Sequence, residues 1–494
     1  MDPIRARVQT AIQQAGSTPW LVGYDVVGIQ EFVTANSRPK AMRGASELIR
    51  RFDQGCGRSP LCIFAGGGRG IELARDEAAA EARMRALADH FYQETRGGTL
   101  ATAAVPYDAR HAQACLQWLS MRLNAAKESL PRPVLRLPHD KTSRCADCLL
   151  FTATQDSPRP DAGGERICDR CAWALRAANE IDEVRQSLSD VSSPWIAAVS
   201  ADGNNMGVFF DSLDSLEQYA AASEAVAQIF AEAHKTALAS LGHSRYVSMV
   251  TGGDDIRVFL PPADLLRYVP ALVRSVEQEA ARCGDLGGLL RADQASALSQ
   301  LGVGVGATVA DGHIPAYRLI AAAQAREKDA KAACRDVRNG GNASQARSAL
   351  DFSIWVTGEE VGERSQASKR SGAARDSRPL SMAADVWERF HAEVEALREV
   401  PTAQRAVLAQ ARELEDREFL NLFRYSVARS VAWQRWYTRC GLDWRRPETL
   451  SVYRPDAAHL DCLRLYQMGH SSASSSAAPP VPPALEKRGD DAGV

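Results

Sequence analysis

Residues 250–256, VTGGDDI, place two adjacent carboxylates, Asp254 and Asp255, directly after two glycines, Gly252 and Gly253. Apolar runs at 246–250 and 256–260 flank them, which predicts a β-hairpin with the carboxylates at its tip. Each carboxylate raises the proton affinity of the other unless a cation neutralises them, so a divalent metal is expected there. The alternative is a turn without chemistry, because Gly and Asp are common in tight turns.

A third acid favours the metal. Residues 195–210, WIAAVSADGNNMGVFF, form an apolar run that ends at Asp202 and continues into a loop of small residues. An acid that leaves a strand beside such a loop can share a metal with the hairpin acids, while backbone N–H groups of the loop bind phosphate oxygens. Three acids on two strands suit a pair of metal ions about 3.5 to 4 Å apart, as in nucleotidyl transfer. Oxygen ligands favour Mg²⁺ or Mn²⁺ over zinc.

Several motifs in a fixed order resemble those of a known family. They are GYDVVGIQEF at 23–32, DGNNMG at 202–207, GGDD at 252–255, GVGVGATVADGHIPAYRLIAAAQAREKDAKAA at 302–333 and LDFSIW at 350–355. Together with a four-cysteine insertion, they resemble the palm domain of the large polymerase-like subunit of type III CRISPR effector complexes. That domain is related to the GGDEF diguanylate cyclases. The resemblance covers most of residues 20–380.

The resemblance implies a fold and a set of site residues. The fold is α+β, with two ferredoxin-like palm (nucleotidyl cyclase) domains, a zinc-binding insertion and a C-terminal helical domain. Asp202, Asp254 and Asp255 would be catalytic and, with Gly203, would bind two Mg²⁺ or Mn²⁺ ions, while Lys331 would contact the triphosphate of ATP. The other residues expected to bind nucleotide are Gly203, Asn204, Asn205, Gly207, Gly252, Gly253 and Asp25. The family often has an N-terminal HD nuclease domain, which we expect to be absent because roughly 20 residues precede the first palm.

The order of predicted elements occurs twice, which indicates an internal repeat. In the first half we expect strands at 21–25, 61–65 and 99–105 and helices at 43–52, at 72–95 and to about 127. In the second half we expect a strand ending at 202, the hairpin, a strand at 303–309, and helices at 215–241, at 263–283 and from 315. Asp25 takes the place of Asp202, but the turn GGGRG at 66–70 has no acid, so the first half is expected to be a degenerate palm that helps to hold nucleotide.

These elements divide the chain into six predicted segments. Residues 1–135 form the degenerate palm, 136–190 the four-cysteine insertion, and 191–360 the active palm. Residues 361–379 are a polar linker, 380–468 a helical domain, and 469–494 a disordered tail rich in Ser, Ala and Pro.

Four cysteines have the spacing of a zinc site. Cys145 and Cys148 form one CxxC pair, and Cys168 and Cys171 form a second pair after nineteen intervening residues. Four thiolates fill a tetrahedral ion and leave no position for water, so the zinc is expected to be structural. A redox role for a single CxxC would not explain why there are two pairs.

Composition limits the class of protein. The chain has 494 residues, 45% hydrophobic and 24% charged, as in a soluble globular protein of several domains. No apolar run of about 20 residues is present and the N-terminus lacks the apolar core of a signal peptide, so we expect a cytoplasmic protein without membrane contact. A formal charge of −2 gives no global sign of nucleic-acid binding.

The function that these expectations favour is a metal-dependent nucleotidyltransferase that converts ATP into a cyclic oligoadenylate second messenger in type III CRISPR-like antiviral defence. The expected partners are other effector subunits and guide or target RNA. One alternative is a stand-alone nucleotide-signalling cyclase, and another is a scaffold subunit that binds nucleotide without turnover. A template-directed polymerase is less favoured because the sequence has no segment large enough for fingers or a thumb.

Overall fold

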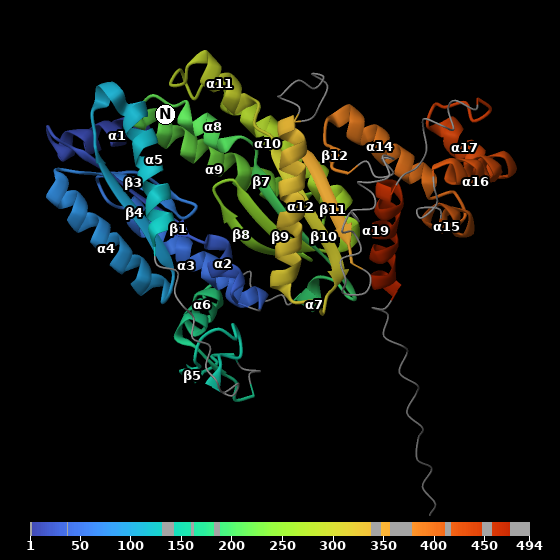
Figure 1. Cartoon of the computed structure of the whole chain (residues 1–494), viewed down its shortest axis with the longest axis horizontal. Coiled ribbons are helices and arrows are strands. Elements are labelled where there is room, and N and C mark those ends of the chain that lie inside the picture. The colour runs from blue at the N-terminus through green and yellow to red at the C-terminus, as the bar shows by residue number, and fades with distance from the viewer. Residues whose placement is uncertain are drawn as a thin grey trace, which may run out of the picture.

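The computed structural model describes residues 2–36, 38–130, 143–159, 163–181, 188–336, 347–355, 378–410, 416–446 and 457–474. It is a mixed α and β structure built around two β-sheets that lie beside each other (Figure 1). The C-terminal helices lie at the far end of the second sheet from the first (Figure 1). Within these ranges, no helix is long and apolar enough to cross a membrane.

The first sheet has four strands in the order β2-β3-β1-β4. Two long helices and one short helix connect its strands in a βαββαβ arrangement, and a further helix, α5, follows β4, as in a ferredoxin-like unit. The elements are α1 (Asp2–Ala15), β1 (Trp20–Val27), α2 (Ile29–Thr34), α3 (Pro39–Gly57), β2 (Cys62–Gly66), β3 (Arg69–Ala74), α4 (Glu77–Thr95), β4 (Thr99–Pro106) and α5 (Ala112–Ser129).

The predicted helix over 72–95 is wrong at its start, because residues 69–74 form the strand β3. This strand lies between β1 and β2, and all of its residues after Arg69 are buried. A strand that is buried on both faces lacks the apolar and polar alternation by which strands are recognised in a sequence. The helix α4 begins only after Asp76, whose side chain accepts a hydrogen bond from Ala79 N and caps it.

The second sheet has six strands in the order β12-β11-β10-β7-β9-β8. Helices α9 and α10 pack on one face of the sheet and α12 packs on the other, against β10 and β7. The elements are β7 (Trp195–Gly203), α8 (Met206–Asp211), α9 (Leu216–Ala239), β8 (Val247–Gly252), β9 (Asp255–Leu260), α10 (Leu265–Cys283), α11 (Ala292–Ser299), β10 (Val303–Asp311), α12 (Ala316–Asp336), β11 (Ala349–Ile354) and β12 (Leu380–Ser381).

The order β2-β3-β1-β4 of the first sheet recurs as β8-β9-β7-β10 in the second, and each of these sets is followed by a helix, α5 or α12. The predicted internal repeat is therefore present in the topology. Helices α1, α2, α8 and α11 have no counterpart in the predicted order of elements.

One hydrophobic core joins the two repeats. It combines Tyr24 and Phe52 of the first repeat with Ala198, Phe259 and Leu319 of the second. Helix α3 lies against β8 at this boundary, where the Arg43 guanidinium donates to Ser248 O. The two repeats thus pack as neighbours over a shared apolar interface.

The remaining described parts are a small unit between the repeats and a helical C-terminal region. The small unit contains β5 (Gln155–Asp156), β6 (Arg166–Ile167) and α6 (Asp169–Asn179). The short helix α7 (Leu188–Val191) follows it in the sequence and lies against β9 of the second sheet (Figure 1). The C-terminal region contains α14 (Ala384–Leu397), α15 (Thr402–Gln410), α16 (Asp416–Arg429), α17 (Val431–Arg439) and α19 (Ala457–Ser474). Helix α19 continues beyond 469, where the sequence predicted the start of a tail. Most of the predicted linker and residues 475–494 lie outside the described residues.

Candidate functional site

Asp254 lies in the tight turn between β8 and β9. Gly252 pairs with Asp255 across the hairpin, so the turn consists of Gly253 and Asp254 alone. Gly253 has a φ of 63°, which favours glycine, and this explains one of the two glycines of the motif. The predicted hairpin is therefore present, with one carboxylate in the turn and the other at the first residue of β9.

Asp202 and Asp254 come together at this turn. Asp202 is the last but one residue of β7, and its carboxyl group lies within hydrogen-bonding reach of that of Asp254. Burial and the neighbouring Asp202 raise the pKa of Asp254 to about 8. The next residue, Gly203, makes this approach sterically feasible, since a Cβ there would lie 2.9 Å from Asp254 Oδ2.

Helix α12 brings a cation to the acid pair. Lys331 Nζ lies 2.5 Å from Asp202 Oδ2 and 3.9 Å from Glu327 Oε1. Ser200 Oγ donates to Glu327 at 2.6 Å, and burial raises the pKa of Glu327 to about 7, with Asp202 adding to the shift. The helix reaches the sheet this closely because of Gly306 in β10, where a Cβ would lie 2.0 Å from a backbone oxygen of α12.

Asp255 has a different partner. Its Oδ2 lies 2.6 Å from Nη2 of Arg257, the residue two positions along β9, whose side chain is only 2% exposed. Burial raises the pKa of Asp255 to about 6, and the Arg257 charge opposes that shift. Asp255 Oδ1 and Arg257 Nη1 are buried without a hydrogen-bond partner among the described residues.

The loop after Asp202 is fixed by its first asparagine. Asn204 N donates to Gly302 O, and Asn204 Nδ2 donates to Arg347 O, both at 2.9 Å. Asn205 has a φ of 63°, and Gly207 has open space where a Cβ would lie. The backbone N–H of Asn204 is therefore already bonded within the protein.

A cavity of about 120 Å³ opens beside this loop, between α8 and α11. Its wall is formed partly by apolar side chains and partly by side chains with amide and carboxylate groups. The lining residues are Asn204, Asn205, Val208, Phe209, Ser212, Asp293, Ala297, Gln300 and Leu301.

The first repeat has a glycine and a cation where the second has its two hairpin acids. Register gives the correspondence: Gly66 pairs with Arg69 as Gly252 pairs with Asp255. Gly68 therefore corresponds to Asp254, and Arg69 to Asp255. Asp25, the counterpart of Asp202, lies 3.1 Å from Arg69 Nε and 2.5 Å from Lys127 Nζ.

The glycine turns of the two repeats touch each other. A Cβ at Gly67 would lie 3.6 Å from Gly253 N, and one at Gly252 would lie 3.6 Å from the Cα of Gly67. Residues 66–70 and 252–255, more than 180 positions apart in the sequence, thus form one surface at the boundary of the repeats.

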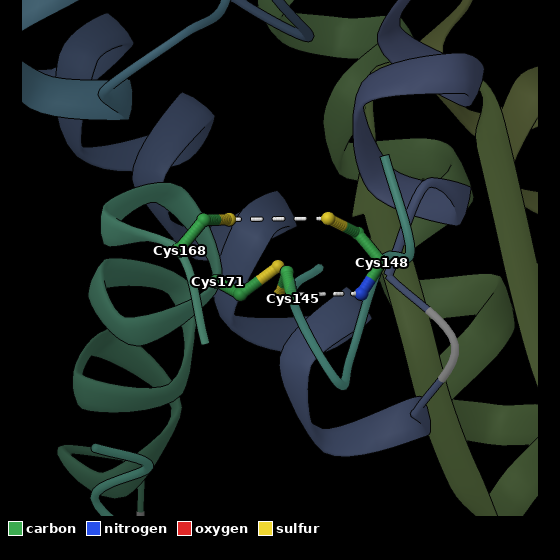
Figure 2. A group of neighbouring side chains, drawn as sticks. All are labelled: Cys145, Cys148, Cys168 and Cys171. Carbon is green, nitrogen blue, oxygen red and sulfur yellow. Dashed lines mark hydrogen bonds between the residues drawn. The ribbon is translucent and has the colours of Figure 1, made fainter. Parts of the chain in front are cut away.

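The four predicted zinc ligands also converge. Cys145 and Cys148 lie on a loop, and Cys168 and Cys171 lie at the start of α6, with the sulfur atoms directed toward a common centre (Figure 2). All four are buried, and their sulfur atoms lie within 4.8 Å of one another. A Cys₄ set of this size suits one tetrahedral zinc ion with no open position.

Within the described ranges, these cysteines are the one group of three or more acidic, His or Cys side chains whose ligand atoms gather in this way. The three aspartates do not form such a group: Asp202 and Asp254 meet, while Asp255 is paired with Arg257. The other predicted site residues around the acid pair and its loop are Gly203, Asn205, Gly252, Gly253 and Lys331. Asp25 lies in the first repeat.

Sequence reasoning missed four charged residues of this region: Arg69, Lys127, Arg257 and Glu327. Arg257 could have been recognised from the sequence, because a charged residue in the apolar run 256–260 requires a buried partner. Glu327 lies one helical turn before Lys331, a spacing at which a Glu and Lys pair interacts. Arg69 and Lys127 could not have been recognised in this way, since their contacts with Asp25 depend on how the elements of the first repeat pair and pack.

Comparison with known proteins identifies relatives of this structure. Residues 195–339 match the family model described as Cas10/Cmr2, second palm domain. A search of curated proteins found no match. The predicted resemblance to the large subunit of type III CRISPR complexes is confirmed by this family match and by similarity to solved structures of Csm1.

Three of those solved structures show how far the likeness extends. Csm1 of T. onnurineus has 14% identity and a TM-score of 0.55, with 92% of this chain and 70% of that chain covered. A Csm1-Csm4 cassette in complex with cA4 has 15% identity and a TM-score of 0.53, with 93% and 72% covered. A Csm1-Csm4 subcomplex in the type III-A CRISPR-Csm interference complex has 16% identity and a TM-score of 0.51, with the same coverage. At these identities the likeness shows the fold.

Proposed function

Taking as premise that the chain is Cas10-like, we propose that it is a metal-dependent nucleotidyl cyclase that converts ATP into cyclic oligoadenylate in type III CRISPR-like defence. The observation that carries the proposal is the contact of Asp202 with Asp254 at a glycine-lined turn, with Lys331 beside it. A similar structure, a Csm1-Csm4 cassette, contains cA4, and another contains pppApA, which supports a product of this class.

The acids would hold the metal ions that the proposal requires. Asp202 and Asp254 are close enough to share a divalent cation. Burial and repulsion by Asp202 raise the pKa of Asp254, and a bound cation would relieve that repulsion. We propose Gly203 and Asp255 as further members of this site. A bound divalent ion would lower the pKa of a ribose hydroxyl and stabilise the departing pyrophosphate.

The chain's own residues would orient the nucleotide. Gly252 and Gly253 carry no side chains, so a substrate can approach their backbone closely. Lys331 has a flexible stem, and it can exchange its contact with Asp202 for a triphosphate oxygen. Gly207 and Asn205 supply loop backbone, and Asn204 holds that loop through Arg347 O.

In the first repeat, Arg69 and Lys127 neutralise Asp25, so the described residues of this half include no acid cluster suited to a divalent cation. We propose that it is the degenerate palm and contributes binding surface where its glycine turn meets Gly252. We also propose that the four cysteines bind structural zinc, and that other effector subunits and guide or target RNA are partners.

The test is to incubate the purified chain with each NTP and Mg²⁺ or Mn²⁺, with and without RNA, and to identify products by mass spectrometry. We expect cyclic oligoadenylate from ATP only when metal is present. Turnover that persists in EDTA would contradict the metal assignment, and product from GTP but not ATP would overturn the substrate. Nucleotide binding without product under every condition would favour the scaffold function.

A further inference from the structure

Arg257 is a buried cation within an apolar strand. It lies in β9, DIRVFL, where every residue after Asp255 is buried, and it is among the largest fully buried side chains of the described chain. Burying a guanidinium without a partner is strongly unfavourable, so the strand needs a fixed anion beside it. Asp255 Oδ2, at 2.6 Å, is that anion.

A second contact ties the guanidinium to the first repeat. With its amide oxygen facing Arg257, Gln324 of α12 accepts from Nε at 3.2 Å and from Nη2 at 3.0 Å. The same amide lies 3.2 Å from Nε2 of Gln30, in the helix α2 that follows β1. Arg257 is therefore held on two sides, by Asp255 within its own strand and by Gln324 from the helix above.

Lys331 and Arg257, the two cations near the acids, differ in how easily each can move away from its carboxylate partner. Lys331 is 15% exposed, has a long flexible stem and contacts Asp202, which is 32% exposed. Arg257 is 2% exposed and is enclosed by the sheet and α12. A divalent cation can replace Lys331 at Asp202, whereas replacing Arg257 would leave an unpaired charge in the interior.

Charge balance follows from this difference. When Lys331 turns away, Asp202 and Asp254 present two negative charges, which one divalent ion neutralises. Asp255 remains neutralised by Arg257, and its Oδ1 is buried.

From these contacts we infer that Arg257 is a positioning residue that reserves Asp255, so that the nucleotide-free site binds one divalent ion, on Asp202 and Asp254. A second ion would enter only with the triphosphate. This inference rests on the proposed function, because it concerns the metal that the cyclase would use. It limits the proposed role of Asp255 as a metal ligand to the second ion, since in the nucleotide-free chain Asp255 is held by Arg257.

The test is a Mn²⁺ titration of the zinc-loaded, nucleotide-free chain, followed by EPR of the free ion. We expect one bound Mn²⁺ per wild-type chain. Asp254→Asn should weaken that binding at least about tenfold, as expected when a metal-binding group loses its charge. The paired variant Asp255→Asn with Arg257→Met removes anion and cation together, and it should bind Mn²⁺ within about twofold of wild type.

Two outcomes would overturn the inference. One is a wild-type chain that binds two Mn²⁺ ions without nucleotide, a result that needs no variant to fold. The other is a paired variant that folds, as judged by its melting temperature, but loses Mn²⁺ binding as fully as Asp254→Asn. Failure of the proposed function is separable: a chain that binds one Mn²⁺ through Asp254 but makes no product from ATP contradicts only the cyclase activity.

Discussion

Lys331 Nζ lies 2.5 Å from Asp202 Oδ2, so in the nucleotide-free chain a lysine neutralises one of the acids that we assign to metal binding. A lysine that pairs with the acid in one state and with phosphate in another would have opposite effects on the two ligands. Its removal should favour the bare cation and disfavour the nucleotide.

Lys331→Met tests this exchange. We expect Mn²⁺ affinity of the nucleotide-free chain to rise, because a competing charge is lost, and KM for ATP to rise about tenfold or more, because a charged hydrogen bond to phosphate is lost. Lys328→Met is the matched control, since Lys328 is exposed on the same helix, and both constants should stay near wild type. A Lys331→Met variant with unchanged KM would show that the lysine does not reach the nucleotide.

The charge difference between the repeats gives the second prediction. Replacing Asp254 and Asp255 together by Asn removes both hairpin acids while keeping the size of their side chains. Loss of one preorganised charge at such a centre costs about 10² to 10³ in rate, so loss of two should leave no detectable product.

Asp25→Asn is the comparison variant for that experiment. Asp25 lies between Arg69 and Lys127 and is not part of the acid pair, so turnover at saturating ATP should remain measurable, with nucleotide binding weaker or unchanged. If Asp25→Asn were inactive at saturation while the double variant kept normal turnover, the active repeat would be misassigned.

Much of this arrangement could be predicted from local sequence. The hairpin was recognisable from its two glycines between apolar runs, and the Cys₄ group from its spacing, because both signals lie within short segments. The strand β3 was missed because full burial removes alternation. The contacts of Lys127 with Asp25 and of Gly67 with Gly253 depend on which segments pack together, and no local pattern encodes that.

Zinc is expected to be structural. Elemental analysis should find about one zinc per chain, and Cys148→Ser should lower the melting temperature or the solubility, because metal binding at a Cys₄ site contributes folding free energy. Ser129→Ala is a suitable control, since Ser129 lies at the exposed end of α5. Protein purified without chelator that contains no zinc would contradict the assignment.

Asp53 provides a test of how the first glycine turn is held. Its Oδ1 accepts from Tyr24 OH at 2.9 Å, and its Oδ2 accepts from Gly68 N at 2.8 Å, so a buried carboxylate fixes the turn that meets Gly252. Burial raises the pKa of Asp53 from 3.8 to about 6, although both hydrogen bonds oppose the shift. The folded chain therefore binds a proton on Asp53 that the unfolded chain has already released between these two values.

The sign of the pH dependence follows from that proton. Where the native state binds more protons than the unfolded state, stability falls as pH rises, so Asp53 contributes a decrease between about pH 4 and pH 6. Asp53→Asn lacks the ionisation, and nearby groups such as Glu72 titrate in both proteins. The free energy of unfolding of wild type minus that of Asp53→Asn should therefore fall by about 2 to 3 kcal/mol across this range and then level off.

Tyr24→Phe sharpens the measurement. It removes a hydrogen bond that lowers the folded-state pKa of Asp53, so the decrease should extend to higher pH and become larger, with the same direction. Chemical denaturation at half-unit steps from pH 4 to pH 8 measures all three proteins. If the difference in free energy of unfolding between wild type and Asp53→Asn is flat over this range, then burial does not raise the pKa of Asp53. A difference that increases with pH would show that the turn stabilises the ionised form, and that Gly68 N and Tyr24 outweigh the cost of burying the charge.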